Sequence, residues 1–496
     1  MIHPARDLLS AVQLLLVYAS AVWLPLGVWA HPASAAEPPS LNVLFITVDD
    51  MNCDSVGAFG CEVPDITPNI DRLAAEGMRF EHAHVNIAIC MPTRAVWMTG
   101  RYPHRSGALG FDRINADVPT LVEALKDSGY HTGILGKTPH VVPSRHAAFD
   151  VIVPATELKS GRSPALYYER CKEFFEKIKA ADQPFFLMAN AQDPHRPFAG
   201  SEQEAQRKGR RRAKDRGGFP GVSRTYRPEE VTVPGFLPDL PDVHQEMAEY
   251  YTSVHRADET VGAVLKALEE SGLADSTLVV FMSDHGMPLP FAKTNCWRHS
   301  TRTPWIVRRP GVVKPDSVDR EHMISGIDFA PTIFDALGIK PIEGMDGRSI
   351  VPLLKGETQA DRDYVFTSIN RTSARNEYPM RAVNSKKHGY IFNAWSNGTT
   401  RFRNESQNGL TMRAMIQAAE DDPQIAARVQ HFLHRTPEEF YDYEADPDAL
   451  HNLIDDPQYQ DEIARFRRLL HEQMQATGDP QSEAFERMVL KKHATQ

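Results

Sequence analysis

Three uncharged, mostly apolar runs constrain the fold of this chain more than any other feature of its sequence. They are Leu41–Val48, Pro184–Ala191 and Ser276–Met282. Runs of this kind predict strands that are buried on both faces, as in a parallel sheet covered by helices. Segments with helical periodicity, Leu121–Ser128 and Val243–Ser271, lie between them. The sequence therefore predicts an α/β fold with a mostly parallel sheet between layers of helices.

Carboxylates follow two of these strands directly. Asp49 and Asp50 come after the first run, and Asp284 with His285 comes after the third. α/β folds build their sites at the carboxyl ends of parallel strands. Adjacent carboxylates repel each other and need a cation or strong donors. An acidic turn would explain the Asp pair taken alone, but a second acidic residue at another strand end favours a metal site.

A motif around Cys90 supplies a candidate nucleophile. The stretch reads Cys-Met-Pro-Thr-Arg-Ala-Val-Trp-Met-Thr-Gly, with Pro92 at an early helical position. Cys90 is therefore expected near a helix N-terminus, where unsatisfied N–H groups favour a thiolate or another developing anion. Arg94 adds a permanent cation one turn away. The simpler alternative is a buried structural cysteine beside an ordinary arginine.

Four basic or titratable residues stand after strands or in loops between them. Lys137 and His140 follow the strand 130–135, and His195 follows the second apolar run between two prolines. Lys293 lies in the loop after the third run, where a solvated lysine is the alternative reading. Cations suit an anionic group, and imidazoles suit proton transfer.

Taken in order, these motifs resemble the sulfatase family from about residue 40 to about residue 475. The series is the Asp pair, the Cys motif, Gly-Lys, Asp-Pro-His, Ser-Asp-His-Gly and the Tyr-Asp segment of EEFYDYEADPDALHNL. The segments DPHRP, VTVPGFLPDLP and MPLPFAKTN are similar to the sulfamidase (N-sulfoglucosamine sulfohydrolase) branch. The resemblance implies an alkaline-phosphatase-like fold: a large mixed, mostly parallel sheet sandwiched by helices, with a smaller C-terminal antiparallel sheet and helix.

The resemblance also implies a site and its chemistry. A formylglycine-generating enzyme would oxidise Cys90 to formylglycine, whose hydrated aldehyde attacks a sulfated saccharide. The implied metal, Ca²⁺ or another divalent ion, would be held by Asp49, Asp50, Asp284, His285 and modified Cys90. Arg94 would orient the nucleophile, Lys137 and Lys293 would bind sulfuryl oxygens, His195 would protonate the leaving atom, and His140 would take the proton that expels sulfate.

Two residues depart from the family pattern. Family members commonly have the histidine two residues after the lysine, whereas His140 comes three residues after Lys137. Many members have Asn at the position of His285, although Asp-His also occurs. Hard Ca²⁺ prefers oxygen donors, so His285 leaves the identity of the metal open.

The ends of the chain suggest its processing and domain division. Residues 1–36 resemble a secretory signal peptide, with Arg6, an apolar stretch and Ala33-Ser34-Ala35. An uncleaved anchor is the alternative, because the apolar stretch is nearly long enough to span a bilayer. We expect an exported protein without a stable membrane span, a catalytic α/β domain at 37–365 and a smaller α+β subdomain at 366–496.

The remaining signals limit the partners and leave two other functions open. A net charge of −10 argues against nucleic-acid binding. The basic loop 207–216 suggests either a solvated insertion or a patch for a sulfated glycan. A phosphonate monoester or phosphodiester hydrolase could use the same modified cysteine. A catalytically inactive glycan-binding protein is the other alternative, and the oligomeric state is not indicated.

Overall fold

An eight-stranded sheet organises the chain in the computed structural model, which describes residues 41–141, 145–210 and 219–494. The strand order is β5-β4-β6-β1-β7-β8-β2-β9. β1 lies at the centre and pairs in parallel with both β6 and β7, whereas β8 runs antiparallel to its neighbours. The strands are β1 (Asn42–Asp49), β2 (Met78–Phe80), β4 (His131–Leu135), β5 (Val151–Val153), β6 (Phe185–Pro194), β7 (Thr277–Ser283), β8 (Trp305–Arg308) and β9 (Ser317–Asp319).

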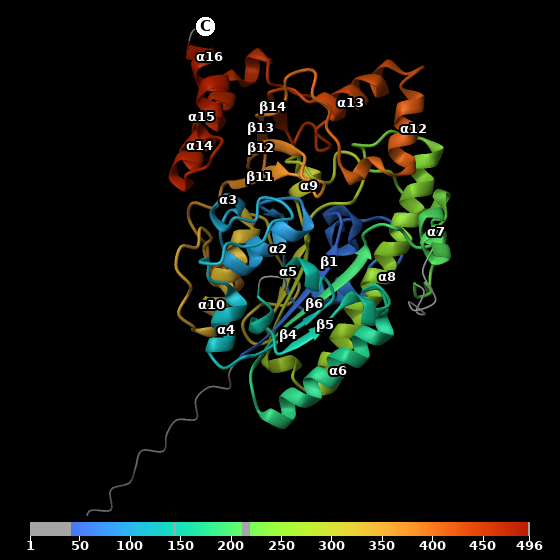
Figure 1. The fold of residues 1–496 in the computed structure, drawn as a ribbon, viewed down its shortest axis with the longest axis vertical. Coiled ribbons are helices and arrows are strands. Elements are labelled where there is room, and N and C mark those ends of the chain that lie inside the picture. The colour runs from blue at the N-terminus through green and yellow to red at the C-terminus, as the bar shows by residue number, and fades with distance from the viewer. Residues whose placement is uncertain (1–40, 142–144, 211–218, 495–496) are drawn as a thin grey trace, which may run out of the picture. The chain divides into compact units, whose positions relative to one another are not determined.

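Helices cover both faces of this sheet because its strands are apolar on both faces. Along β1, Leu44, Ile46 and Val48 join one hydrophobic cluster, and Val43 and Phe45 join another. Successive side chains of a strand point to opposite faces, so these clusters are the two sides of the sheet. Figure 1 shows α6 and α8 on one side and α4 and α10 on the other. Their bounds are α6 (Pro164–Ala181), α8 (Pro241–Ser271), α4 (Leu121–Asp127) and α10 (Phe329–Leu337).

A second, antiparallel sheet follows in the C-terminal part. Its order is β11-β12-β13-β14, and α14 packs against it through Ile463, Phe466, Leu470 and Met474. The fold class predicted from the sequence is thus confirmed, whereas the domain boundary at 365/366 stays a prediction. The elements are β11 (Val365–Arg371), β12 (Glu377–Asn384), β13 (His388–Asn393), β14 (Glu438–Asp442), α12 (Leu410–Ala418), α13 (Pro423–His434) and α14 (Gln460–Thr477).

Short elements complete the fold around these layers. They are α1 (Pro68–Ala75), α2 (Cys90–Thr99), α3 (Pro103–Ser106), α5 (Thr138–Val141), α7 (Glu202–Arg210), α9 (Arg298–Thr301), α11 (Val351–Leu354), α15 (Ser482–Phe485), α16 (Lys491–Ala494) and the two-stranded sheet of β3 (Ala83–His84) with β10 (Ile324–Ser325). α2 begins at Cys90, as the sequence predicts. The proposed signal peptide lies outside the described residues. Within the described ranges, none of the helices has the length and hydrophobicity needed to cross a membrane.

Phe45 offers a test of the doubly covered sheet. Its ring is fully buried and stacks on Phe329 at 4.1 Å between ring centroids, with Trp97 edge-on at 5.1 Å. We expect Phe45→Ala to destabilise the fold by about 3–5 kcal/mol, since it removes a large side chain from a packed interior. Chemical denaturation followed by fluorescence measures this loss.

Ile416→Ala serves as the control because Ile416 is 44% exposed. Its change in unfolding free energy should stay within about 0.5 kcal/mol. Equal losses in the two variants would contradict the assigned burial of β1.

Candidate active site

The carboxylates that follow β1 and β7 meet at one edge of the sheet. The two strands are parallel neighbours in a register that pairs Val48 with Ser283, so the residues after each strand lie together. The backbone N–H of Asp50 donates to Asp284 Oδ1 at 3.1 Å. Asp50 has a φ of 69°, a left-handed conformation that aspartate tolerates better than most residues. Asp49, Asp50 and Asp284 are all fully buried.

Each of these buried carboxylates is opposed by a cation from a different segment. Lys137 forms an ion pair with Asp49. Lys293 Nζ donates to both oxygens of Asp50 at 2.8 Å. Burial by itself would raise the pKa of Asp284, but the neighbouring His285 and Arg94 hold it well below its usual range. Buried charges are tolerated when they are paired in this way.

Arg94 is fully buried and holds three acceptors at once. Its Nη1 donates to Asn190 Oδ1 at 2.7 Å and to Thr47 Oγ1 at 3.0 Å, and its Nη2 donates to Asp284 Oδ2 at 3.0 Å. These acceptors belong to β1, β6 and the segment after β7. Arg94 therefore ties α2 to three neighbouring strands of the sheet.

Four residues fit a divalent metal ion. One potential ligand atom from each of Asp49, Asp50, Cys90 and His285 lies within 4.8 Å of the others. Asp49 Oδ1 and His285 Nε2 are buried and lack a hydrogen-bond partner among the described residues. His285 Nδ1 lies 3.1 Å from the carbonyl oxygen of Gly286, so it donates there and leaves the Nε2 lone pair for a ligand. Asp284 is engaged by Arg94 and by the Asp50 backbone instead.

Cys90 is the first residue of α2, but its thiol is not activated. Burial raises its pKa to about 12, and the carboxylates of Asp284 and Asp50 add to the effect against the opposing charges of Lys293 and Arg94. Desolvation outweighs the helix terminus, because the side chain is only 4% exposed.

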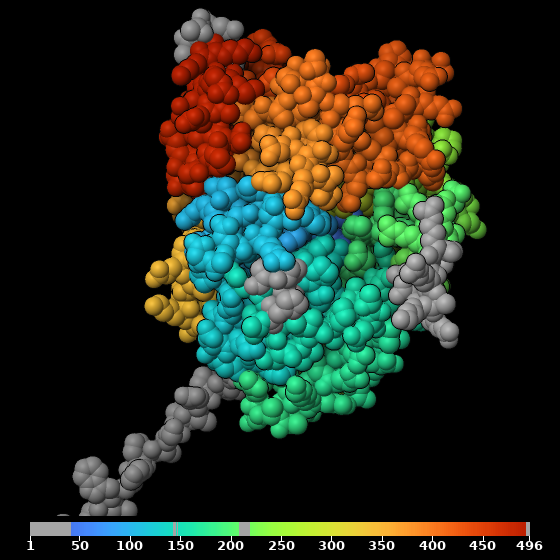
Figure 2. Space-filling view, viewed as in Figure 1, coloured from blue at the N-terminus to red at the C-terminus, as the bar shows by residue number. Residues whose placement is uncertain are grey.

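A cavity of about 390 Å³ opens above Cys90 and brings most of the predicted residues together. Figure 2 shows the surface hollowed between the orange C-terminal segments and the blue and green segments beneath them. Burial lowers the pKa values of His140 and His195 well below the usual range, helped by neighbouring lysines. Both imidazoles are therefore neutral. The predicted residues that line the cavity are Cys90, Lys137, His140, His195 and Lys293.

His195 is held by residues that the sequence reading did not identify. Asp193, at the end of β6, is bonded to two buried arginines, Arg162 and Arg256. Arg162 Nη2 also donates to the carbonyl oxygen of His195 at 2.8 Å. His195 Nδ1 lies 2.7 Å from the Arg196 carbonyl oxygen, which leaves Nε2 facing Asp50 at 4.0 Å. The ring is thus fixed in orientation before any substrate arrives.

The rim of the cavity comes from parts of the chain that carry no family motif. Phe111 and Ser373 line it from the segments 107–116 and 370–378. Glu405 was missed, since no spacing or strand end marks it. An adjoining cavity of about 470 Å³ shares Gln192 and His195 and is also lined by Arg207. Residues 211–216 of the basic loop lie outside the described ranges.

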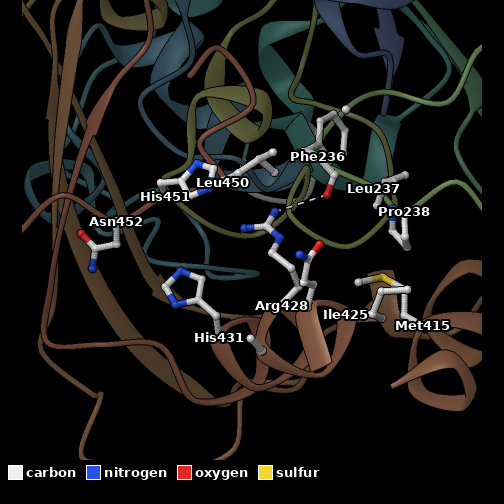
Figure 3. A pocket seen from close by; sticks show the side chains of 13 residues that line it. Phe236, Leu237, Pro238, Met415, Ile425, Arg428, His431, Leu450, His451 and Asn452 are labelled. Atoms are coloured by element: carbon white, nitrogen blue, oxygen red, sulfur yellow. Dashed lines mark hydrogen bonds between the residues drawn. The ribbon is translucent and has the colours of Figure 1, made fainter. Parts of the chain in front are cut away.

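A larger cavity, of about 620 Å³, contains none of these groups. It lies between the loop 235–238, helices α12 and α13 and the residues after β14. Figure 3 shows Arg428 directed at the carbonyl oxygen of Phe236, to which its Nη2 donates at 3.3 Å. Size alone therefore does not mark the site. The chemistry gathers in the smaller cavity, where the strand ends converge.

Comparison with known proteins places this arrangement in a family. The sulfatase family profile matches residues 41–339. The chain belongs to the sulfatase family. The enzyme class predicted from the sequence, a sulfuric ester hydrolase, and the alkaline-phosphatase-like fold are thereby confirmed.

Relatives match over most of the length of this sulfatase. N-sulphoglucosamine sulphohydrolase of Homo sapiens is 29% identical, covering 88% of this chain and 91% of its own. An ulvan-active sulfatase of Formosa agariphila is 27% identical, covering 91% and 78% respectively. A solved structure of a protein in complex with its substrate D-glucosamine-2-N,6-O-disulfate aligns with a TM-score of 0.65 at 19% identity, covering 89% of this chain and 99% of that chain.

Arg94 gives a test of the buried charge network. A lysine in its place keeps the charge but cannot reach Thr47, Asn190 and Asp284 together. We expect Arg94→Lys to reduce kcat at least about a hundredfold and to lower the unfolding midpoint, because a buried pair is broken. Steady-state turnover and thermal unfolding measure the two effects.

Arg170→Lys is the matched control, since Arg170 lies on the exposed face of α6. Turnover and unfolding should both stay at the wild-type level in that variant. Near-normal turnover in Arg94→Lys would rule out the proposed need for a planar, multiply bonded cation.

Proposed function

We propose that this protein hydrolyses sulfate esters or sulfamates of a sulfated carbohydrate, with an N-sulfoglucosamine unit as the candidate substrate. One observation carries the proposal: two lysines and two neutral imidazoles converge on Cys90 in a single cavity above buried carboxylates. A sulfuryl group needs cations for its oxygens and an acid–base pair for its transfer. The names of the relatives, an N-sulphoglucosamine sulphohydrolase and an ulvan-active sulfatase, support a carbohydrate substrate.

The nucleophile in this proposal is Cys90 after its conversion to formylglycine by a formylglycine-generating enzyme. The unmodified thiol is poorly suited to attack, because burial keeps it protonated. A hydrated aldehyde at the same position presents hydroxyl groups instead. The Cys-x-Pro-x-Arg motif supports this modification.

Asp49, Asp50, His285 and the modified residue 90 would hold the metal ion, Ca²⁺ or another divalent cation, and Asp284 would complete the set. The bound ion would lower the pKa of a coordinated hydroxyl and attract a sulfuryl oxygen. The unpartnered Asp49 Oδ1 and His285 Nε2 support this assignment. Arg94 would keep Asp284 ionised and in place.

Of the remaining side chains, the two lysines would bind the substrate and the two histidines would transfer protons. Lys137 and Lys293 would bind the sulfuryl oxygens, whose charge must be held as the bond to sulfur breaks. His195, with its fixed ring, would assist the departing atom by delivering to it a proton that Nε2 has first taken up. His140, which is neutral and also lines the cavity, would accept a proton from the nucleophile when sulfate is expelled. We also propose that residues 1–36 direct export and are then removed.

The metal assignment can be tested without an activity assay. We expect Ca²⁺ added to chelator-treated protein to raise the unfolding midpoint, with about 2.7 kcal/mol of stabilisation at a hundred times Kd. Asp49→Asn should abolish most of this shift, because it removes a charged ligand. Differential scanning calorimetry measures it.

Glu472→Gln, an exposed substitution on α14, should leave the calcium-dependent shift intact. A shift of equal size in Asp49→Asn would place the ion elsewhere. Repeating the titration with Mg²⁺ and Mn²⁺ would identify the preferred metal.

The decisive test of the whole proposal joins mass spectrometry with turnover. In protein from a host with the modifying enzyme, the peptide containing Cys90 should carry an aldehyde in place of the thiol. The same preparation should release sulfate from sulfated glucosamines, and Cys90→Ala should not. Faster turnover of aryl phosphonates would favour the phosphonate hydrolase. An intact thiol with no turnover of any sulfated sugar would favour the inactive binding protein.

A further inference from the structure

Glu405 is the one carboxylate among the described residues that line the cavity above Cys90. The other charged groups of that lining are cationic or become so on protonation. A carboxylate at this place opposes the binding of an anionic substrate unless the substrate offers it a hydrogen-bond donor or a positive charge. Its presence therefore indicates that the substrate group next to the sulfuryl unit carries a hydrogen-bond donor or a positive charge.

Hydrogen bonds before and after Glu405 in the chain hold its segment against the site. Asn404 Nδ2 donates to the carbonyl oxygen of Lys293 at 3.1 Å. Farther along, buried Glu246 accepts from the backbone N–H groups of Leu410 and Thr411 at 3.0 and 2.8 Å, and from Arg196 at 2.7 Å. Arg196 is the residue after His195. Glu405 is thus held in position relative to both Lys293 and His195.

Glu405 can still accept a hydrogen bond from a substrate, because its partner Lys293 is shared with a second carboxylate. Lys293 forms ion pairs with both Asp50 and Glu405, so one cation faces two carboxylates. One ligand atom from each of Asp50, His195 and Glu405 lies within 4.8 Å of the others. Two groups at that separation can both hydrogen-bond to a single atom placed between them. The Glu405 side chain is also 34% exposed, which leaves it accessible from the cavity.

We infer that Glu405 makes this enzyme select nitrogen over oxygen as the atom bonded to the sulfuryl group. The inference rests on the proposed function, in which His195 faces the leaving atom. A sulfamate nitrogen carries a hydrogen that a carboxylate accepts, whereas an ester oxygen has only lone pairs, which the carboxylate repels. A site built to accept an N–H rejects the analogue that lacks it.

The same geometry favours the products of sulfamate cleavage. The S–N bond breaks as the sulfur bonds to the nucleophile at position 90, and the electron pair stays on nitrogen. Nitrogen takes one proton, the one that the attacking hydroxyl at position 90 releases and that His195 Nε2 carries across, and a second from water, which gives an ammonium ion. The Glu405 carboxylate stabilises that charge, while the alkoxide character that develops in ester cleavage would be opposed by it.

Glu405→Gln tests this with two substrates that differ in one atom. Methyl glucosides with an N-sulfo or an O-sulfo group at carbon 2 are assayed by sulfate release. We expect the wild type to prefer the N-sulfo compound, and Glu405→Gln to reduce the ratio of kcat/KM values at least about tenfold. Glu405→Asp should retain part of the preference. Glu420→Gln, at an exposed position in the turn after α12, is the control and should keep the wild-type ratio.

A second measurement uses the product alone. Methyl glucosaminide should inhibit the wild type competitively and Glu405→Gln at least about tenfold more weakly, because its ammonium group loses the charge partner. If Glu405→Gln lowers kcat/KM equally for the N-sulfo and O-sulfo substrates, Glu405 only positions Lys293 and the inference is overturned. A wild type that hydrolyses O-sulfated sugars but not the N-sulfo compound would also overturn it, although the proposed function would then stand. If the wild type hydrolyses no sulfated sugar, both the proposed function and the inference about Glu405 are contradicted.

Discussion

The pairing of buried opposite charges is the constraint on which the rest of this structure depends. Asp49, Asp50 and Asp284 are fully buried, and each is opposed by a cation from another segment. Removing one partner of such a pair leaves an uncompensated charge that destabilises a fold by several kcal/mol. The central strands, α2 and the loop that carries Lys293 must therefore be in place together. This charged edge of the sheet and the folded state are stabilised by the same contacts.

Burial also decides the protonation states above this charged layer. The imidazoles of His140 and His195 are neutral and the thiol of Cys90 is protonated because desolvation disfavours their charged forms. The cavity thus combines two lysines, each ion-paired with a buried carboxylate, with neutral proton carriers. This combination suits the transfer of an anionic group, in which charge must be held and protons moved at different atoms. It also explains why an unmodified cysteine would be a poor nucleophile here.

The C-terminal part completes the site without contributing to its central charges. Ser373 and Glu405 reach the cavity from segments that follow the large sheet in the chain. Glu246, on the long helix α8, bonds to both Arg196 and the start of α12, so it joins the two parts close to the site. The charged groups at the strand ends thus lie on the α/β framework, and Ser373 and Glu405 line the cavity from the C-terminal part.

Local patterns in the sequence determined the strands, the long helices and the residues at the strand ends. The apolar runs predict β1, β6 and β7, and parallel neighbours bring their final residues together, which is why Asp49, Asp50 and Asp284 could be grouped in advance. Cys90 at a helix start and Lys137 after a strand follow from the same local reasoning. These features depend on periodicity and turn chemistry within a few residues of each position.

Only the tertiary structure decided the environment of those residues and the composition of the rim. Whether Cys90 is a thiolate depends on its desolvation by segments far along the chain. The bonds of Arg94 to three strands, the arginines that hold Asp193 and the approach of Glu405 to Lys293 arise between residues separated by tens to hundreds of positions. No local pattern records such contacts, because they exist only when the packed layers bring distant segments together.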